Sequence, residues 1–123
     1  MYHKPAVVQV CLMSHLSWDT WASLDAIMCM ESTEEPDETA RICVRDLTKL
    51  DYSTIADCAG GREGNGLLHL MGTKTRDLKP KHRYLPWVVV NGSHDETVQK
   101  EAETDLLELV CRLYQVWKCE FIA

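Results

Sequence analysis

The sequence contains no apolar run approaching the roughly 20 residues that a membrane-spanning helix needs. Its first residues, MYHKPAVVQVCLM, lack the basic segment and the long apolar segment of an export signal. Positive charge is also scarce, because 13 Lys and Arg stand against 19 Asp and Glu, which gives a net charge of −6. Nucleic acids and anionic membranes select basic surfaces, so we expect neither a nucleic acid nor a membrane among the partners.

The motifs of several enzyme classes are missing as well. No Cys-x-x-Cys occurs, the spacing that lets one thiolate attack a disulfide and a second thiol release the product. The cysteines form no close pairs and none lies beside a histidine at ligand spacing, so we expect no metal site. The stretch AGGREGNG follows no predicted strand, which argues against a phosphate-binding loop. Nothing selects His15, His69 or His82 as a general base. The residues alone therefore predict no catalytic group and no cofactor.

What the sequence does contain is cysteine. The number is even and high for 123 residues, which favours an oxidising compartment and three disulfides among Cys11, Cys29, Cys43, Cys58, Cys111 and Cys119. The triplet Asn-Gly-Ser beginning at Asn91 fits an N-glycosylation acceptor. The composition is thus typical of a secreted protein, although no signal peptide is visible. A chain of this length has room for one domain, residues 1–123.

Helical spacing of apolar residues dominates the chain. It predicts one long helix or two consecutive helices over residues 7–30, with Ser17 or Asp19 as a cap at a break. An acidic connector, residues 31–38, leads to a helix that Pro36 begins. A short helix starts at Asp51 or Ser53 and stops at Gly60 or Gly61, another runs to Gly72, and a final helix of about 20 residues starts near Glu96.

One strand is predicted, Trp-Val-Val-Val at residues 87–90, between Pro86 and an Asn-Gly turn. A single strand cannot pair its own backbone groups. Either a second strand lies in the following SHDETV, or the partner strands are not in this sequence.

Several stretches together carry a resemblance to a known family: CLMSHLSWDTWASLDAIMCME, ARICVRDL, STIADCAGG, GLLHLMGTKTRDLKPKHRYLPWVVVNG and LLELVCRLYQ. The chain resembles the gamma-interferon-inducible lysosomal thiol reductase family over nearly its whole length, and its six cysteines fall where that family has cysteines. The resemblance implies an α/β class, a partial thioredoxin-like fold that is mostly helical. A helical insertion would span residues 7–75, and a cis-proline strand with a C-terminal helix would span residues 84–123.

The resemblance also implies a function. Pro86 would be the cis-proline that faces the redox cysteines, and Leu85, Pro86 and Trp87 would form a substrate-binding surface for disulfide-containing or unfolded polypeptides. The location would be lysosomal or secreted. The family's Cys-x-x-Cys half is not in this sequence, so we expect the chain alone to be inactive as a thiol-disulfide oxidoreductase. The alternatives are a non-catalytic polypeptide-binding module that uses the same surface, and a fragment that does not fold.

The cysteines would then be structural. Cys29 and Cys43 flank the acidic connector, and a disulfide between them would close a loop worth about 3 kcal/mol in the chain-entropy model. The pairs left over are Cys11 with Cys58 and Cys111 with Cys119. Six cysteines allow about 15 connectivities, so the sequence leaves the pairing open.

Overall fold

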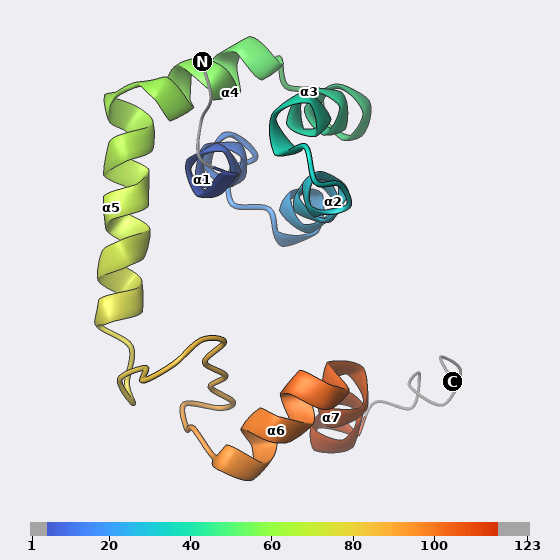
Figure 1. The fold of residues 1–123 in the computed structure, drawn as a ribbon, viewed down its shortest axis with the longest axis vertical. Coiled ribbons are helices and arrows are strands. Elements are labelled where there is room, and N and C mark those ends of the chain that lie inside the picture. Colours follow the sequence, from blue (N-terminus) through green and yellow to red (C-terminus); the bar gives the residue numbers. More distant parts are fainter. Residues whose placement is uncertain (1–4, 116–123) are drawn as a thin grey trace. The chain divides into compact units, whose positions relative to one another are not determined.

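We describe residues 5–115 of a computed structural model, without the side chains of residues 36 and 37. This part of the chain forms seven helices in two compact units, which divide between Thr73 and Lys74 (Figure 1). The helices are α1 (Pro5–His15), α2 (Thr20–Glu31), α3 (Pro36–Leu47), α4 (Tyr52–Gly60), α5 (Arg62–Arg76), α6 (Glu96–Thr104) and α7 (Leu106–Tyr114). None of the helices in the described range is long and apolar enough to span a bilayer.

The predicted helix starts in the first unit are confirmed. Asp19 caps α2, where its side chain accepts a hydrogen bond of 2.8 Å from a backbone N–H of the first turn. Asp51 caps α4 in the same way at 3.0 Å, and Pro36 begins α3. Residues 7–30 hold two helices, not one, because Ser17 and Trp18 adopt positive φ angles of 56° and 59° that interrupt the helical path.

The core of the first unit lies between two disulfide-linked pairs of helices. Cys11–Cys58 joins α1 to α4, and Cys29–Cys43 joins α2 to α3. The helix pairs that these disulfides connect are also the pairs that pack most extensively against each other. The buried apolar side chains between them are Val8, Leu12, Ala26, Met30, Ala40, Val44 and Ile55.

A glycine sets the junction between α4 and α5. As predicted, α4 ends at Gly60, and α5 begins two residues later. Gly64 lies so close to α4 that an added Cβ would be 2.4 Å from the carbonyl oxygen of Cys58. Helix α5 then continues to Arg76, past the predicted end at Gly72.

The final helix of the sequence prediction is two helices in the structure. Asp95 caps α6, and its carboxylate accepts hydrogen bonds from two backbone N–H groups at 2.8 and 3.0 Å. Asp105 leaves the helical conformation, and its carboxylate accepts a hydrogen bond of 2.9 Å from the backbone N–H of Glu108 at the start of α7. A short acidic side chain that caps a new helix competes with continuation of the old one, so the predicted single helix is wrong.

The predicted α/β class is also wrong, because residues 5–115 contain no β-strand and the fold seen there is all-α. The sequence Trp-Val-Val-Val is extended only enough to form one isolated bridge, between Val90 and Ser93. The Asn-Gly turn inside this bridge is as predicted, since Asn91 and Gly92 have positive φ angles of 50° and 80°. The stretch SHDETV supplies no second strand, and a β-prone segment without a partner strand cannot form a sheet.

Candidate functional site

The segment around Pro86 is a loop before α6, the Pro86 loop (residues 84–88), whose first three residues are exposed. The Leu85–Pro86 peptide bond is cis, as the resemblance implies. Leu85 is 80% exposed and Trp87 is half-buried. Within residues 5–115 the backbone N–H and carbonyl of Leu85 have no hydrogen-bond partner. The loop therefore presents an apolar side chain beside backbone groups that can still form hydrogen bonds.

Gln99 of α6 fixes the backbone of this loop. The Gln99 side-chain amide is buried, and its Nε2 donates a hydrogen bond of 3.0 Å to the carbonyl oxygen of Pro86. Its Oε1 accepts a hydrogen bond of 2.8 Å from the backbone N–H of Val88. A carboxamide offers one donor group and one acceptor group side by side, as a backbone peptide does. Gln99 thus pairs with the loop as a neighbouring strand would.

A cluster of rings supports the other side of the loop. Trp87 and His94 are stacked, with ring centroids 3.6 Å apart and planes 9° apart, and Tyr84 contacts Trp87 edge to face at 4.9 Å. His94 Nδ1 lies 2.9 Å from the carbonyl oxygen of Val88. Because a carbonyl oxygen only accepts, Nδ1 carries a proton there. The other ring nitrogen, Nε2, lies 3.1 Å from the Tyr84 hydroxyl.

Glu96 completes the cluster with a negative charge. One of its carboxylate oxygens lies 3.3 Å from His94 Nε2 and 3.1 Å from the Tyr84 hydroxyl. Hydrogen bonds from His94 and then from Tyr84 lower the pKa of Glu96 below its usual value. Partial desolvation, followed by the hydrogen bond to Glu96, raises the pKa of Tyr84. The Glu96 carboxylate therefore keeps its negative charge to a lower pH than an ordinary glutamate does.

A cavity of about 510 Å³ opens next to the ring cluster. Its lining includes His82, Trp87, His94 and Glu96, together with the cationic side chains of neighbouring residues. The indole Nε1 of Trp87 and the Nδ1 of His82 are buried without a hydrogen-bond partner in the described structure. Residues from both sides of the Pro86 loop therefore meet here. Of the histidines weighed from sequence, only His82 belongs to this region, because His69 is exposed on α5 and His15 pairs with Glu63 at 2.9 Å.

The cysteines of the described structure are all oxidised. The observed disulfides Cys11–Cys58 and Cys29–Cys43 confirm two of the three pairings considered above. Cys111 is disulfide-bonded as well, and its predicted partner, Cys119, lies outside the described residues. Residues 5–115 thus provide no thiolate that could act as a nucleophile.

One group of side chains in the first unit has the residue types of a metal site. Ligand atoms of His15, Cys58 and Glu63 lie within 4.8 Å of one another. The Cys58 sulfur, however, is bonded to Cys11 and has no thiolate charge to offer a metal ion. We therefore do not assign a metal site to His15, Cys58 and Glu63.

The residues of this candidate site that the sequence does not predict are Gln99, His94 and Glu96. His94 and Glu96 lie in SHDETV, which the sequence indicates only as a candidate second strand, and Gln99 follows on α6 without any motif. Their role depends on contacts with residues 84–88, which no local spacing reveals. The predicted glycosylation residue, Asn91, is exposed in its turn, where its Oδ1 accepts a hydrogen bond of 3.2 Å from the Tyr114 hydroxyl.

Several known proteins with related names are similar in sequence to this chain. No protein-family model matches the chain. The chain is 34% identical over 113 residues to a gamma-interferon-inducible lysosomal thiol reductase of Carassius auratus, covering 89% of this chain and 43% of that protein. It is 33% identical over 110 residues to the mouse protein of the same name, covering 89% and 42%. A GILT-like protein of Caenorhabditis elegans is 35% identical over 92 residues, covering 75% and 27%. The chain thus spans less than half the length of these relatives.

Proposed function

Since the chain belongs to the gamma-interferon-inducible lysosomal thiol reductase family, which it matches over 89% of its length, we propose that it supplies the polypeptide-binding part of a protein-disulfide reductase. The Pro86 loop carries this proposal. Leu85 offers an exposed apolar side chain and unpaired backbone groups, which an extended polypeptide can engage by adding to the loop as a strand. Gln99 keeps the adjoining backbone fixed, so little order has to be gained on binding.

The proposed chemistry is thiol-disulfide exchange on the bound polypeptide. A thiolate of a protein dithiol attacks one sulfur of the substrate disulfide, the S–S bond breaks, and the leaving sulfur takes a proton. The second thiol loses its proton and attacks the mixed disulfide, so the dithiol becomes a disulfide and the substrate gains two thiols. The 123 residues contain no Cys-x-x-Cys, so in this proposal the dithiol is supplied from outside them.

The second candidate function is a non-catalytic module that binds polypeptides through the same loop. It is favoured by the absence of a free cysteine from residues 5–115. The two functions agree for this chain by itself, which should bind an extended polypeptide without reducing it. They differ when the dithiol is restored, because only the reductase then turns over.

The experiment measures binding and turnover of the same chain. A fluorescein-labelled extended peptide with one internal disulfide is titrated with the 123-residue protein and followed by fluorescence polarisation, and insulin reduction is assayed in parallel. We expect binding without insulin reduction, and at least tenfold weaker binding for Leu85→Asp. Leu106→Asp is the matched control, because Leu106 is another exposed leucine of the same unit, on α7.

Three results would contradict the proposed function. Absence of peptide binding would overturn the role of the loop. Equal weakening by the Leu85 and Leu106 variants would mean non-specific apolar attachment. Insulin reduction by the 123-residue chain would overturn the proposal that the dithiol lies elsewhere.

The proposal includes a lysosomal or secretory location and a glycan on Asn91. Disulfides such as Cys11–Cys58 persist in oxidising compartments, and the Asn91 side chain is exposed. Protein made in the secretory pathway of a eukaryotic cell should lose mass on treatment with N-glycosidase. Ser93→Ala should abolish that mass change and Ser93→Thr should retain it, since only Thr preserves the acceptor triplet. An unchanged mass for the parent protein would rule out the glycan.

A further inference from the structure

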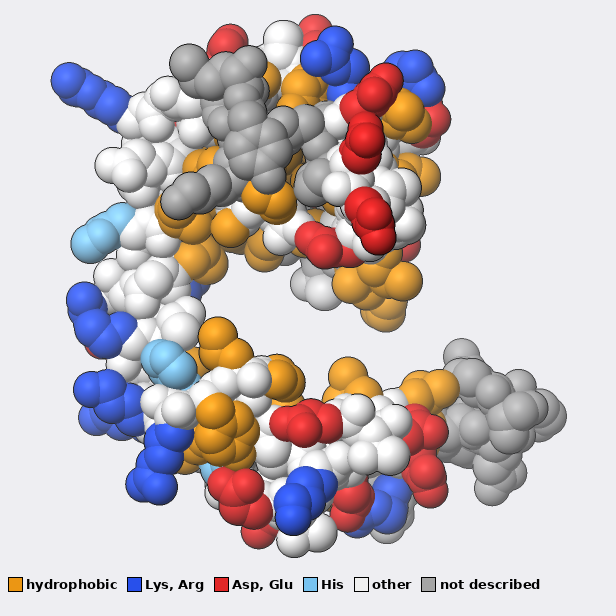
Figure 2. All heavy atoms as spheres, viewed as in Figure 1, with side chains coloured by type: hydrophobic (Ala, Val, Ile, Leu, Met, Phe, Trp, Pro, Cys, Tyr) orange, Lys and Arg blue, Asp and Glu red, His pale blue; other side chains and the backbone are white. Residues whose placement is uncertain are grey.

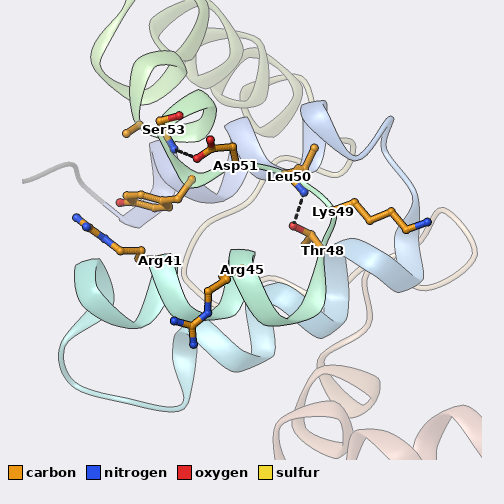
Figure 3. Close-up of a pocket in the computed structure, with 9 residues that line it drawn as sticks. Arg41, Arg45, Thr48, Lys49, Leu50, Asp51 and Ser53 are labelled. Atoms are coloured by element: carbon orange, nitrogen blue, oxygen red, sulfur yellow. Dashed lines mark hydrogen bonds between the residues drawn. The ribbon is translucent and has the colours of Figure 1, made fainter.

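A groove of about 690 Å³ lies between α3 and α4 in the first unit, and none of its lining residues belongs to the Pro86 loop or to the ring cluster (Figure 3). One wall is formed by α3, which contributes Arg41 and Arg45. The other wall is formed by the turn after α3 and the start of α4, with Leu50, Tyr52 and Ala56. The walls differ in character, since the first is cationic and the second combines these three apolar side chains with the polar or charged Thr48, Lys49, Asp51 and Ser53.

Three cations line the groove, and two of them form a row along α3. Arg41 and Arg45 are four residues apart and share one face of α3, and Lys49 follows just beyond the helix end. All three side chains are exposed, in a chain whose net charge is −6. The Arg41 guanidinium lies 5.4 Å from the centroid of the Tyr52 ring, a cation–π contact that holds it at the groove. Such a local excess of positive charge requires an explanation in an acidic protein.

Two carboxylates lie near the row, and neither cancels it. Asp46 pairs with Arg45 at 2.7 Å, but both side chains are more than half exposed, and exposed pairs of this kind exchange partners at little cost. Asp51 accepts a hydrogen bond of 3.0 Å from the backbone N–H of Ser53 (Figure 3), so its charge is directed at the N-terminus of α4.

The floor of the groove is fixed by its own hydrogen bonds. The Thr48 hydroxyl donates to the carbonyl oxygen of Val44 and accepts from the backbone N–H of Leu50 at 3.1 Å (Figure 3). These contacts hold the turn in place, so the apolar wall exists before any ligand arrives.

We propose that this groove binds an extended acidic segment of a polypeptide in which acidic and apolar residues alternate. Arg41 and Arg45 are separated by about 6 Å along the helix axis, at 1.5 Å per residue. Alternate side chains of an extended chain are about 6.6 Å apart and share one face. Carboxylates at alternate positions therefore match the two arginines, while the intervening side chains face Leu50, Tyr52 and Ala56.

This spacing separates a polypeptide from a small oxyanion. A phosphate needs donors that converge on one point, whereas these cations are spread along a row with an apolar wall opposite. This proposal rests on the proposed function only because it takes a polypeptide as the ligand. The groove would be a second polypeptide-binding site, and its ligand need not contain a disulfide.

The test uses the complete 123-residue chain and a cysteine-free, fluorescein-labelled peptide of ten residues with alternating Glu and Leu. Polarisation titrations at low and moderate salt should show binding that weakens as salt rises. Arg45→Glu should lower the affinity at least tenfold. Arg76→Glu is the matched control, because Arg76 is also exposed and also pairs with the next residue, Asp77, but does not line the groove. Circular dichroism confirms that each variant keeps its helices.

Each remaining outcome overturns the proposal. It fails if the peptide does not bind, if Arg45→Glu and Arg76→Glu weaken binding equally, or if a Lys-Leu peptide binds as well. Complete competition by millimolar inorganic phosphate would replace it with an oxyanion site. Leu85→Asp should leave the affinity for this peptide unchanged, so failure of the Pro86 loop and failure of the groove are distinguishable.

Discussion

The Gln99 side chain forms the two backbone hydrogen bonds that a neighbouring β-strand would otherwise provide to the Pro86 loop. It is one of only two buried polar or charged side chains in the described structure, and it bonds the backbone on both sides of Trp87. The sequence does not reveal this role, because a glutamine on an amphipathic helix is ordinarily a solvent-facing residue. The resemblance to a family points to Trp87 and to the cis-proline before it. The role of Gln99, which holds them, is visible only from its contacts in the folded chain.

We predict that Gln99→Leu lowers the free energy of unfolding by about 1–3 kcal/mol, because it leaves the half-buried Pro86 carbonyl and Val88 N–H without their partner. The amide of Val88 should also exchange its hydrogen faster. Lys100→Leu, an exposed polar-to-apolar change on the same helix, should have no such effect. Chemical denaturation and hydrogen exchange measure both quantities. Unchanged exchange at Val88 in Gln99→Leu would mean that the side chain does not hold the loop.

Glu96 predicts a loss of stability in acid. Its pKa is lowered in the folded protein by hydrogen bonds from His94 and Tyr84, so its contribution is fully present above its ordinary pKa of 4.5. That contribution is lost as pH falls through the lower, folded-state pKa. Melting temperatures of the parent protein and Glu96→Gln should therefore differ at pH 6 and converge toward pH 3. Melting curves that stay equally far apart at every pH would contradict this assignment.

Among the helices, the sequence predicts beginnings better than continuity. Asp19, Pro36 and Asp51 begin helices as expected, because capping chemistry is local. The break at Asp105 escapes detection because apolar residues keep their helical spacing across it, from α6 into α7. The predicted strand fails for the opposite reason, since β-propensity in residues 87–90 is local while pairing needs a partner.

The α4–α5 junction gives a prediction with an internal control. Gly64→Ala would place a Cβ 2.4 Å from the Cys58 carbonyl oxygen and 2.9 Å from a methyl carbon of Val7, so we expect a loss of about 1–3 kcal/mol in unfolding free energy. Gly66→Ala, on the same helix, meets nothing within 4 Å and should be neutral or gain up to about 1 kcal/mol from helix propensity. Urea denaturation compares the two. Equal effects of the two substitutions on the unfolding free energy would contradict the close contact between Gly64 and α4.

Both units of the described structure expose large apolar side chains. Figure 2 shows them at the surface of both units. On α2, Trp21 is 75% exposed and Met28 is 62% exposed, and on α7, Leu106 is 57% exposed. In each unit these side chains share a helix with buried ones, such as Ala26 and Leu109, so the helices are apolar on more than the face that packs inward. Apolar surface of this extent is typical of proteins that meet a partner.

We therefore predict that the 123-residue chain self-associates when no partner is present. Sedimentation velocity at increasing concentration should show species larger than 14.1 kDa. Substituting Leu106 and Leu113 by Glu should shift the distribution toward the monomer, because both side chains lie on the exposed part of α7 while Leu109 keeps its buried contacts. The control variant Lys100→Glu on α6 changes the charge of an exposed side chain without removing apolar surface and should leave association in place. A monomer at every concentration would mean that the apolar surface of α7 is too small to drive association in water.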